Sequence, residues 1–573
     1  MLFKQIRIEN FRNFEKICID LENKNVLFGL NDIGKTNFLY ALRFLFDREC
    51  RKNGLYESDF YQRNTLAEIK ITVELDINDK SDNDNKKIRK WMAGAIASGY
   101  DTVYMQLRAS FISGSISAMP ELFWGSDFEN LEPIPSNQAF FSIDRIFNVV
   151  YIDSSVQLNN IFKRYTREIL NKESGMTEDE NRIIKAIIKN LNKKITRLES
   201  IQELEATIRN EYFRYRNESG LEIEIKSELE LENVSSKLVP YIKYRGDGSY
   251  PTSGDGRKKL LAYTLYSLEN RRYEDVKINI FLIEELENHL HRSMQIAISK
   301  QLFADNLFEY MFLTTHSPLI VSWMDKVNLI KLYKVDKTDG KSAHYIVPNE
   351  YMKIKTQLNQ SLAEAIYADY VLLVEGPSEK ILFETIMAIK CPEYELLGGY
   401  ILEVNGINFK VYKQILDKLG VIVIVKTDND LMYNKDKKEY NHLGLNRALS
   451  LIGEGNVKNE AYLDYSTFEK DKIAIQNNIY ANFANKIMIL QSEKIYLSKV
   501  DLENDLYEAI PKKLDEFVKK KNTKKKAVNY LQEKKMIHMV DFCDDLQSMY
   551  IINKILFHER FRCVKELYDL CNR

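Results

Sequence analysis

Eight residues near the start of the chain, Gly29–Thr36, have the composition of a phosphate-binding loop. They read GLNDIGKT and match GxxxxGK[ST], in which two glycines let backbone N–H groups surround a phosphate. Lys35 would place its charge on the β and γ phosphates, and the Thr36 hydroxyl would bind Mg²⁺. An apolar run precedes the loop and a helical pattern follows it, as such a site requires. We predict an ATP and Mg²⁺ site formed by Asn31, Asp32, Gly34, Lys35, Thr36 and Asn37.

Three later segments have residues that suit the same nucleotide. The apolar strand pattern Asn279–Ile283 ends in Glu284 and Glu285, a pair suited to Mg²⁺ coordination and water activation. A second strand pattern ends in His316, which could sense a γ-phosphate, and a loop containing Ser253 and Gly254 could bind phosphate through backbone N–H groups. Each also has a plain alternative: a solvated strand end, a structural polar residue or a simple turn.

A second group of acidic residues follows apolar strand patterns in the last third of the chain. Glu375 follows Val371–Val374, and Asp428 and Asp430 follow the next-but-one strand, while Glu379 lies one helical turn after Glu375. Alternating strands and helices predict a small parallel α/β sheet, whose ligand sites lie at the carboxyl ends of its strands. Four converging carboxylates would repel one another unless divalent cations neutralise them. We predict a Mg²⁺ or Mn²⁺ centre here; unrelated solvated loop acids are the alternative.

The composition limits the remaining possibilities. The 573 residues suggest roughly three or four domains. A net charge of −1 excludes a wholly basic binder but not a local basic groove. The six cysteines are scattered without a CxxC pair, so neither a zinc ribbon nor a disulfide framework is indicated. No signal peptide or membrane-length apolar run is present, and we expect a cytoplasmic protein without a membrane partner.

The middle of the chain has a helical pattern. Apolar residues recur every three or four positions from Ile184 to Ile208, and neither Pro nor Gly occurs between Gly175 and Gly220. This predicts a long amphipathic helix or a pair of helices. A core-facing helix and a subunit interface fit about equally, and we favour dimerisation. The predicted domains are an ATPase head at 1–150 and 236–350, a helical insert at 151–235, and a second α/β domain with a helical extension at 351–573.

In order and spacing, the first set of motifs resembles ATP-binding-cassette ATPases of the structural-maintenance and recombination-repair type. The resemblance implies Glu284 on Mg²⁺, Glu285 as hydrolytic base, His316 as switch histidine, and Ser253 and Gly254 as a signature that acts across a dimer. Glu284 stands where such heads usually have Asp, and the signature lacks its leading Leu and trailing Gln. These departures concern hydrolysis more than nucleotide binding.

The second set, LLVEGPSEK followed by DND, resembles the Toprim fold. A P-loop head followed by Toprim resembles the overcoming-lysogenisation-defect (OLD) nucleases, and within them the A subunits of Gabija antiphage systems. The segments VEGPSEKILFE, VKTDNDL and DLENDLY carry the likeness, although Leu286 replaces the usual Pro. The resemblance implies Asp501, Glu503 or Asp505 on a second metal. It also implies Lys535 near the scissile phosphate, preferred over Lys534 only by the family match.

The predicted activity is two-metal hydrolysis of phosphodiester bonds in double-stranded DNA, serving antiviral defence. The resemblance implies that ATP restrains cutting, that the chain forms a dimer of dimers, and that a UvrD-like helicase B subunit is its partner. The basic run Lys519–Lys526 could follow a DNA backbone or be a solvated loop. The main alternative is an ATP-driven DNA-binding repair clamp whose Toprim domain is only a scaffold. A topoisomerase or primase is disfavoured, because neither a tyrosine nucleophile context nor a zinc motif stands out.

Overall fold

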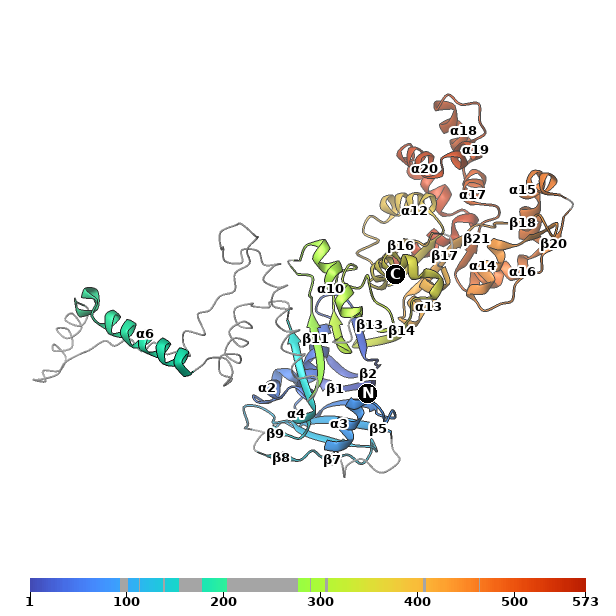
Figure 1. Cartoon of the computed structure of the whole chain (residues 1–573). Coiled ribbons are helices and arrows are strands. Elements are labelled where there is room, and N and C mark those ends of the chain that lie inside the picture. Colours follow the sequence, from blue (N-terminus) through green and yellow to red (C-terminus); the bar gives the residue numbers. More distant parts are fainter. Residues whose placement is uncertain are drawn as a thin grey trace, which may run out of the picture. The chain divides into compact units, whose positions relative to one another are not determined.

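The computed structural model describes residues 1–92, 101–112, 114–137, 140–153, 178–203, 277–288, 290–304, 308–405, 409–462 and 464–572. The chain divides into two compact units. The first comprises Met1–Asp144 and Gln295–Arg573, and the second comprises Arg145–Met294. Figure 1 shows the elements of both. None of the helices in the described ranges has the length and apolar character needed to cross a membrane.

The first unit begins with an antiparallel sheet of order β2-β1-β4-β5-β6-β7. Its alternating sequence predicts one buried face, and in β4 the side chains of Ile69, Ile71, Val73 and Leu75 are fully buried. The strands are β1 (Leu2–Phe11), β2 (Phe14–Asp20), β4 (Ile69–Asp76), β5 (Thr102–Ala109), β6 (Glu121–Gly125) and β7 (Glu132–Pro133).

Four further strands of this unit position the phosphate-binding loop. β3 (Lys24–Phe28) pairs in parallel with β12 (Tyr310–Thr314) and with β13 (Val327–Lys334), and β13 pairs antiparallel with β14 (Thr338–Tyr345). The loop follows β3 and leads into helix α1 (Lys35–Phe46), as predicted. Since β3 and β12 are parallel neighbours, the loop and His316 leave the same edge of the ladder.

A parallel sheet of order β16-β15-β17-β21 carries the acidic residues. Its strands are β15 (Tyr370–Val374), β16 (Gly399–Glu403), β17 (Ile422–Thr427) and β21 (Ile495–Leu497). Along β15 the side chains alternate between two buried clusters: Val371 and Leu373 lie in one, and Leu372 and Val374 in the other. A strand buried on both faces reads as a continuous apolar run, which is why the sequence could predict it.

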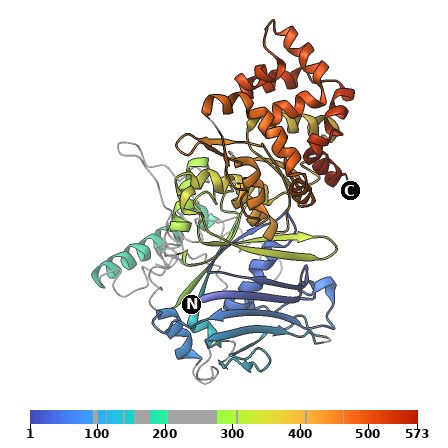
Figure 2. The ribbon, with the colours of Figure 1, turned by 90° about the vertical axis from the view of Figure 1, so that its right-hand side faces the viewer.

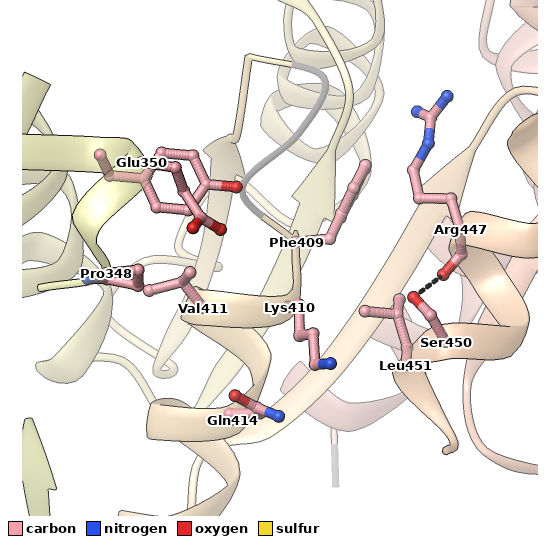
Figure 3. A pocket seen from close by; sticks show the side chains of 10 residues that line it. Pro348, Glu350, Phe409, Lys410, Val411, Gln414, Arg447, Ser450 and Leu451 are labelled. Atoms are coloured by element: carbon pink, nitrogen blue, oxygen red, sulfur yellow. Dashed lines mark hydrogen bonds between the residues drawn. The ribbon is translucent and has the colours of Figure 1, made fainter. Parts of the chain in front are cut away.

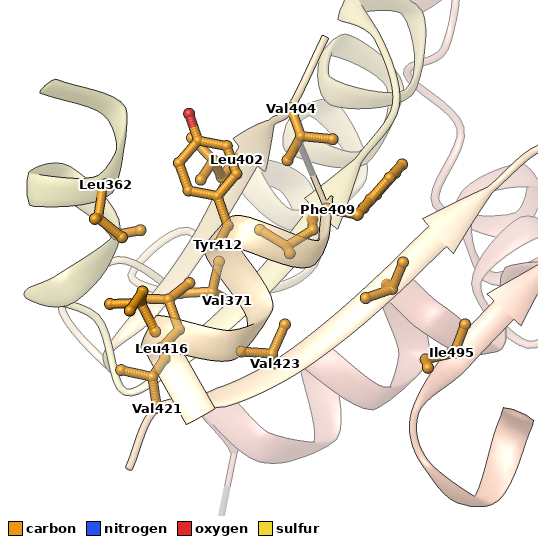
Figure 4. Packing of buried hydrophobic residues seen from close by; sticks show 14 of the residues in the cluster. Leu362, Val371, Leu402, Val404, Phe409, Tyr412, Leu416, Val421, Val423 and Ile495 are labelled. Atoms are coloured by element: carbon orange, nitrogen blue, oxygen red, sulfur yellow. The ribbon is translucent and has the colours of Figure 1, made fainter. Parts of the chain in front are cut away.

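Helices cover both faces of this sheet. α11 (Lys355–Ile366) and α13 (Phe409–Lys418) pack on one face, where Figure 4 shows Leu362, Tyr412 and Leu416 against the strands. The same cluster includes Val26 and Phe28 of β3, so the phosphate-binding strand and the parallel sheet share one core.

The other face is covered by α12 (Pro377–Lys390), which contacts α20 (Lys535–Asp544), and by the C-terminal helices that gather in red in Figure 2. The remaining elements of this half are α14 (Leu443–Leu451), α15 (Tyr465–Asn482), α16 (Ala484–Ser492), α17 (Leu502–Ala509), α18 (Pro511–Lys520), α19 (Ala527–Glu533), α21 (Met549–Leu556), α22 (Arg562–Cys571), and the small antiparallel sheet β18 (Met432–Asn434), β19 (Glu439–Asn441) and β20 (Glu460–Ala461).

In the second unit, β10 (Phe147–Ile152) pairs in parallel with β11 (Ile278–Glu284). The predicted amphipathic helix is present as α6 (Glu178–Thr196), although the end of the predicted pattern lies outside the described residues. Ile183, Ile187 and Leu191 of α6 are exposed. The role of this helix in dimerisation stays a prediction, as do the three predicted domain boundaries.

Candidate metal centre and phosphate-binding loop

The carboxyl edge of the parallel sheet brings Glu375 and Asp428 together. Glu375 directly follows β15, and Asp428 directly follows the neighbouring strand β17. A Glu375 carboxylate oxygen accepts hydrogen bonds from the Thr427 hydroxyl at 3.1 Å and from the Asp428 backbone N–H at 3.2 Å. The Ser498 hydroxyl, just beyond β21, donates to Asp428 at 2.9 Å. Parallel pairing of three strands therefore builds this part of the predicted centre.

Glu379 joins them from the first turn of α12. Pro377 occupies the first turn, where its missing N–H is not needed, and this places Glu379 one turn after Glu375. Glu379 is 6% exposed, and burial together with the charges of Glu375 and Glu503 raises its pKa to about 7. Burial also holds the pKa of Asp428 well above its ordinary value, assisted by Glu379 and Glu375. Both side chains therefore hold a proton more readily than ordinary carboxylates do.

Asp501 and Glu503 complete the group from the start of α17. Asp501 caps this helix by accepting the Asn504 backbone N–H at 2.9 Å, and it also accepts Gln532 at 2.7 Å. Glu503 is 1% exposed, and burial followed by the charge of Asp501 raises its pKa. We refer to Glu375, Glu379, Asp428, Asp501 and Glu503 as the carboxylate centre.

Lys535, at the first position of α20, faces the carboxylate centre. Burial by itself would lower the pKa of Lys535, but the charges of Glu503, Asp428, Glu379 and Asp501 raise it. Lys534 is the residue before the helix, at its N-cap. Lys535 therefore lies near these acids, and its predicted role at the scissile phosphate stays a prediction.

Asp505 lies next to the carboxylate centre, where its charge acts on Glu503, but it is paired with a lysine. Its two carboxylate oxygens accept the Lys426 ammonium at 2.8 Å and the Lys499 backbone N–H at 3.2 Å. Lys426 and Asp505 are each 1% exposed. This buried pairing stabilises Asp505 in the fold, and its role as a metal ligand stays a prediction.

Arg447 on α14 is a member of the site that the sequence did not indicate. Its guanidinium contacts Glu375 at 2.5 Å and Asp430 at 3.0 Å. Asp430 is therefore held at the edge of the centre through Arg447, with 43% of its side chain exposed. No spacing pattern relates Arg447 to the acids, because a separate helix supplies it.

The side chains present fit divalent cations. Carboxylate oxygens are the preferred ligands of Mg²⁺, and burial together with neighbouring carboxylates raises the pKa of Glu379, Asp428 and Glu503, as expected of crowded like charges. Across the described ranges, no three acidic, histidine or cysteine side chains stand together as a ready-made metal cage. Arg447 and Lys535 provide the positive charge in this arrangement, and Arg447 contacts one oxygen each of Glu375 and Asp430.

The phosphate-binding loop has the backbone that its sequence predicts. Gly29 and Gly34 have φ of +149° and +108°, and Asp32 has φ of +62°. The Lys35 ammonium donates to the carbonyls of Gly29 and Leu30, each at 2.8 Å, and so lies across the loop. Gly34 is the residue before α1, whose N-terminus faces the loop. The loop is thus shaped to receive a phosphate at a helix N-terminus.

Two residues of the β1–β2 turn brace this loop and were missed in the sequence. Asn13 donates to the Ile33 carbonyl at 2.9 Å and accepts Asn37 at 2.7 Å. Arg12 donates to the Asn37 side chain at 2.9 Å. Asn37, predicted as a nucleotide contact, therefore ties the start of α1 to the turn. The only signal in the sequence is the polar pair Arg12-Asn13 within the apolar strand pattern.

The other predicted nucleotide-binding residues belong to different units of the chain. In the second unit, Glu284 ends β11 and accepts the Tyr151 hydroxyl at 2.6 Å, while Glu285 has φ of +44°. In the first unit, His316 stacks on Tyr367 with ring centroids 5.7 Å apart. Their roles stay predictions, as do those of Asn31, Asp32 and Thr36. Ser253 and Gly254 lie outside the described residues.

Comparison with known proteins decides the family. Residues 366–430 match the family described as overcoming lysogenization defect protein-like, TOPRIM domain, and residues 1–107 and 110–321 match the AAA ATPase domain. The chain is 42% identical over 580 residues to Endonuclease GajA of Bacillus cereus (strain VD045), covering 99% of both chains. The chain belongs to the GajA endonuclease family. The acids Glu375, Asp428 and Asp430 lie within the matched TOPRIM segment.

Membership of the GajA family confirms the predicted fold class of an ATPase head followed by a Toprim domain. Among solved structures, the chain resembles an SMC head bound to a ScpA domain, with 11% identity over 62% of this chain and all of that chain, at a TM-score of 0.37. The SMC head domain of Thermotoga maritima gives 11% identity over 61% of this chain and all of that chain, at 0.29. These two likenesses are too weak to support an argument about function.

Proposed function

We propose that the chain is an endonuclease that hydrolyses phosphodiester bonds of double-stranded DNA at the carboxylate centre. The observation that carries this proposal is that Glu375 and Asp428 meet at one sheet edge, with Glu379, Asp501, Glu503 and Lys535 near enough to act on one another's charges. A scaffold has no need of a group whose members raise one another's pKa. The repair-clamp alternative leaves that group without a purpose.

The acids and the lysine divide the chemistry between them. Glu375, Glu379, Asp428, Asp501 and Glu503 would hold Mg²⁺ or Mn²⁺, with Asp430 at the edge. When bound, two such cations supply an activated water and a counter-charge for the leaving oxygen. Lys535 neutralises the negative charge that grows on the phosphate during the reaction, and the two helix starts at α12 and α17 hold the acids in place.

Plasmid cleavage tests the proposal. Wild type is incubated with supercoiled plasmid and Mg²⁺ or Mn²⁺, beside Glu379→Gln and, as a matched control, Glu384→Gln on the same helix. Glu384 is 42% exposed and pairs with Lys380, so it lies outside the centre. We expect wild type and Glu384→Gln to cut and Glu379→Gln to lose at least about a hundredfold in rate. Uncut plasmid with wild type under both metals would favour the clamp.

We also propose that nucleotide in the head restrains this nuclease, and contacts at Tyr367 support the coupling. Tyr367 lies between α11 and β15, the strand that ends at Glu375. Its hydroxyl donates to the Thr315 carbonyl, and its ring stacks on His316. The Tyr367 ring also meets Phe28, the residue before the phosphate-binding loop, with centroids 5.6 Å apart.

A displacement of His316 by nucleotide would therefore act on the strand that carries Glu375. Tyr367→Ala tests this step. We expect the variant to bind a fluorescent ATP analogue as wild type does and to cut plasmid without suppression by ATP. Equal suppression of cutting by ATP in wild type and in Tyr367→Ala would show that coupling takes another route.

The likeness to Endonuclease GajA supports three further parts of the proposal. These are a role in antiviral defence, a homo-oligomer built as a dimer of dimers, and a UvrD-like helicase subunit as partner. Exposed Ile183, Ile187 and Leu191 on α6 are compatible with an interface between copies. Sedimentation equilibrium of the full chain gives the oligomeric state directly, and a monomer would remove the second part.

A further inference from the structure

A pocket of about 380 Å³ lies beside the carboxylate centre. The segment that leads into α11 forms one wall with Pro348, Glu350 and Tyr351. Figure 3 shows Lys410 and Gln414 of α13 on a second wall and Ser450 of α14 on a third. A volume of this size is within the range of small-ligand sites, which is roughly 300–1,000 Å³.

Arg447 links the pocket to the carboxylate centre. It lines the pocket, and its guanidinium reaches Glu375 at 2.5 Å and Asp430 at 3.0 Å. The guanidinium carbon also lies 6.0 Å from the ring centroid of Phe409, which is 1% exposed. Arg447 thus touches both acids and covers an aromatic ring of the pocket.

Cations bound at the centre would compete with Arg447 for the oxygens of Glu375 and Asp430. A guanidinium released from both acids keeps its charge, because its pKa is far above neutrality. The strongest partner for it at that place is a phosphate oxygen, which guanidinium groups bind through paired N–H donors.

The lining suits a nucleobase. Tyr351, which is partly exposed in the pocket wall, offers a ring on which any base can stack. Gln414 and Glu350 offer amide and carboxylate groups that pair with base edges, and Lys410 adds a charge for the sugar–phosphate chain. An aliphatic ligand would leave these polar groups without partners.

We propose that this pocket binds one nucleobase of the DNA strand that is cut, next to the scissile phosphodiester, and that Arg447 binds the phosphate between that base and the carboxylate centre. The inference rests on the proposed nuclease function. A base held here must leave its stack, as in enzymes that extrude a nucleotide. The residues that contact its edge would then contribute to sequence preference.

The test uses the full chain with Mn²⁺ and a duplex that contains a cleavage site mapped by sequencing the ends of plasmid products. A stable abasic analogue replaces each of the three nucleotides on either side of the cut in turn. We expect one position at which the base loss lowers kcat/KM by about 5-fold to 100-fold, the range of one base–aromatic contact. Tyr351→Ala should lower cutting of intact DNA similarly and should add little further loss on the abasic duplex.

A matched pair of lysines controls for general charge. Lys410 lines the pocket, whereas Lys418 is an exposed lysine at the other end of the same helix. We expect Lys410→Ala to weaken cutting and Lys418→Ala to match wild type. The inference would be overturned if the abasic site lowers kcat/KM by the same factor in wild type and in Tyr351→Ala. It would also be overturned if free deoxynucleotides inhibit cutting while Tyr351→Ala and the abasic site still act independently. Wild type that cuts no duplex at all contradicts the proposed function instead.

Discussion

Metal binding at the carboxylate centre should release a proton, and the pKa of Glu379 sets the pH range in which this release occurs. With a pKa of about 7, about nine tenths of Glu379 carries a proton at pH 6 and about one tenth at pH 8. A cation must displace that proton, so Mn²⁺ affinity should fall about tenfold per pH unit below about pH 7. That fall corresponds to about 1.4 kcal/mol per unit.

Calorimetric titration of the nucleotide-free chain with Mn²⁺, in two buffers of different ionisation enthalpy, counts the protons. We expect about one more proton per chain at pH 6 than at pH 8, and Glu379→Gln should remove most of that difference. The raised pKa values of Asp428 and Glu503 can only add to this difference in proton release. Proton release that is the same at pH 6 and pH 8 would refute the reasoning.

The same pKa has a consequence for stability without metal. The folded-state pKa of Glu379 is raised from 4.5 to about 7. Its contribution to the free energy of unfolding is therefore fully present below pH 4.5 and is lost as pH rises through about 7. The rise corresponds to about 3 kcal/mol. In EDTA, Glu379→Gln should therefore be more stable than wild type by about that amount at pH 8, and the two should converge near pH 4.5 in urea denaturation.

Three further predictions concern single residues. Lys426→Met should destabilise the chain by about 3–5 kcal/mol in urea, because it leaves Asp505 buried without its cation, and adding an apolar replacement of Asp505 should restore much of the loss. Lys535→Ala should lower the plasmid-cutting rate about 100-fold to 1,000-fold, whereas Lys534→Ala should stay near wild type; equal effects would contradict the placement of Lys535. Gly34→Ala should weaken binding of a fluorescent ATP analogue by about tenfold or more, since φ of +108° disfavours any side chain, and unchanged affinity would contradict the loop geometry.

The parts of the site that could be predicted from sequence are those fixed by strand periodicity. A strand buried on both faces leaves an uninterrupted apolar run, and the residue after it must lie at the sheet edge. Glu375 and Asp428 were placed in this way. The phosphate-binding loop was predictable for a related reason, because its glycines are required by backbone angles that other residues rarely adopt.

Helix phase and long-range packing account for what the sequence could not supply. Glu503 and Asp505 are two positions apart on α17, and side chains two positions apart on a helix point in widely different directions. Only the fold shows that Glu503 faces Lys535 while Asp505 faces Lys426. Arg447 comes from a helix whose sequence has no motif, so its contacts with two acids depend entirely on tertiary structure.

Suppression of plasmid cutting by ATP tests most directly whether one chain joins a nuclease to a nucleotide sensor. Cutting by wild type with Mg²⁺ is measured as ATP is titrated, beside Lys35→Ala, whose substituted side chain can no longer reach the loop or a phosphate. The account predicts that ATP suppresses cutting by wild type and leaves Lys35→Ala active. Cutting by both proteins that is indifferent to ATP would contradict the coupling, and cutting that requires ATP would point to a motor.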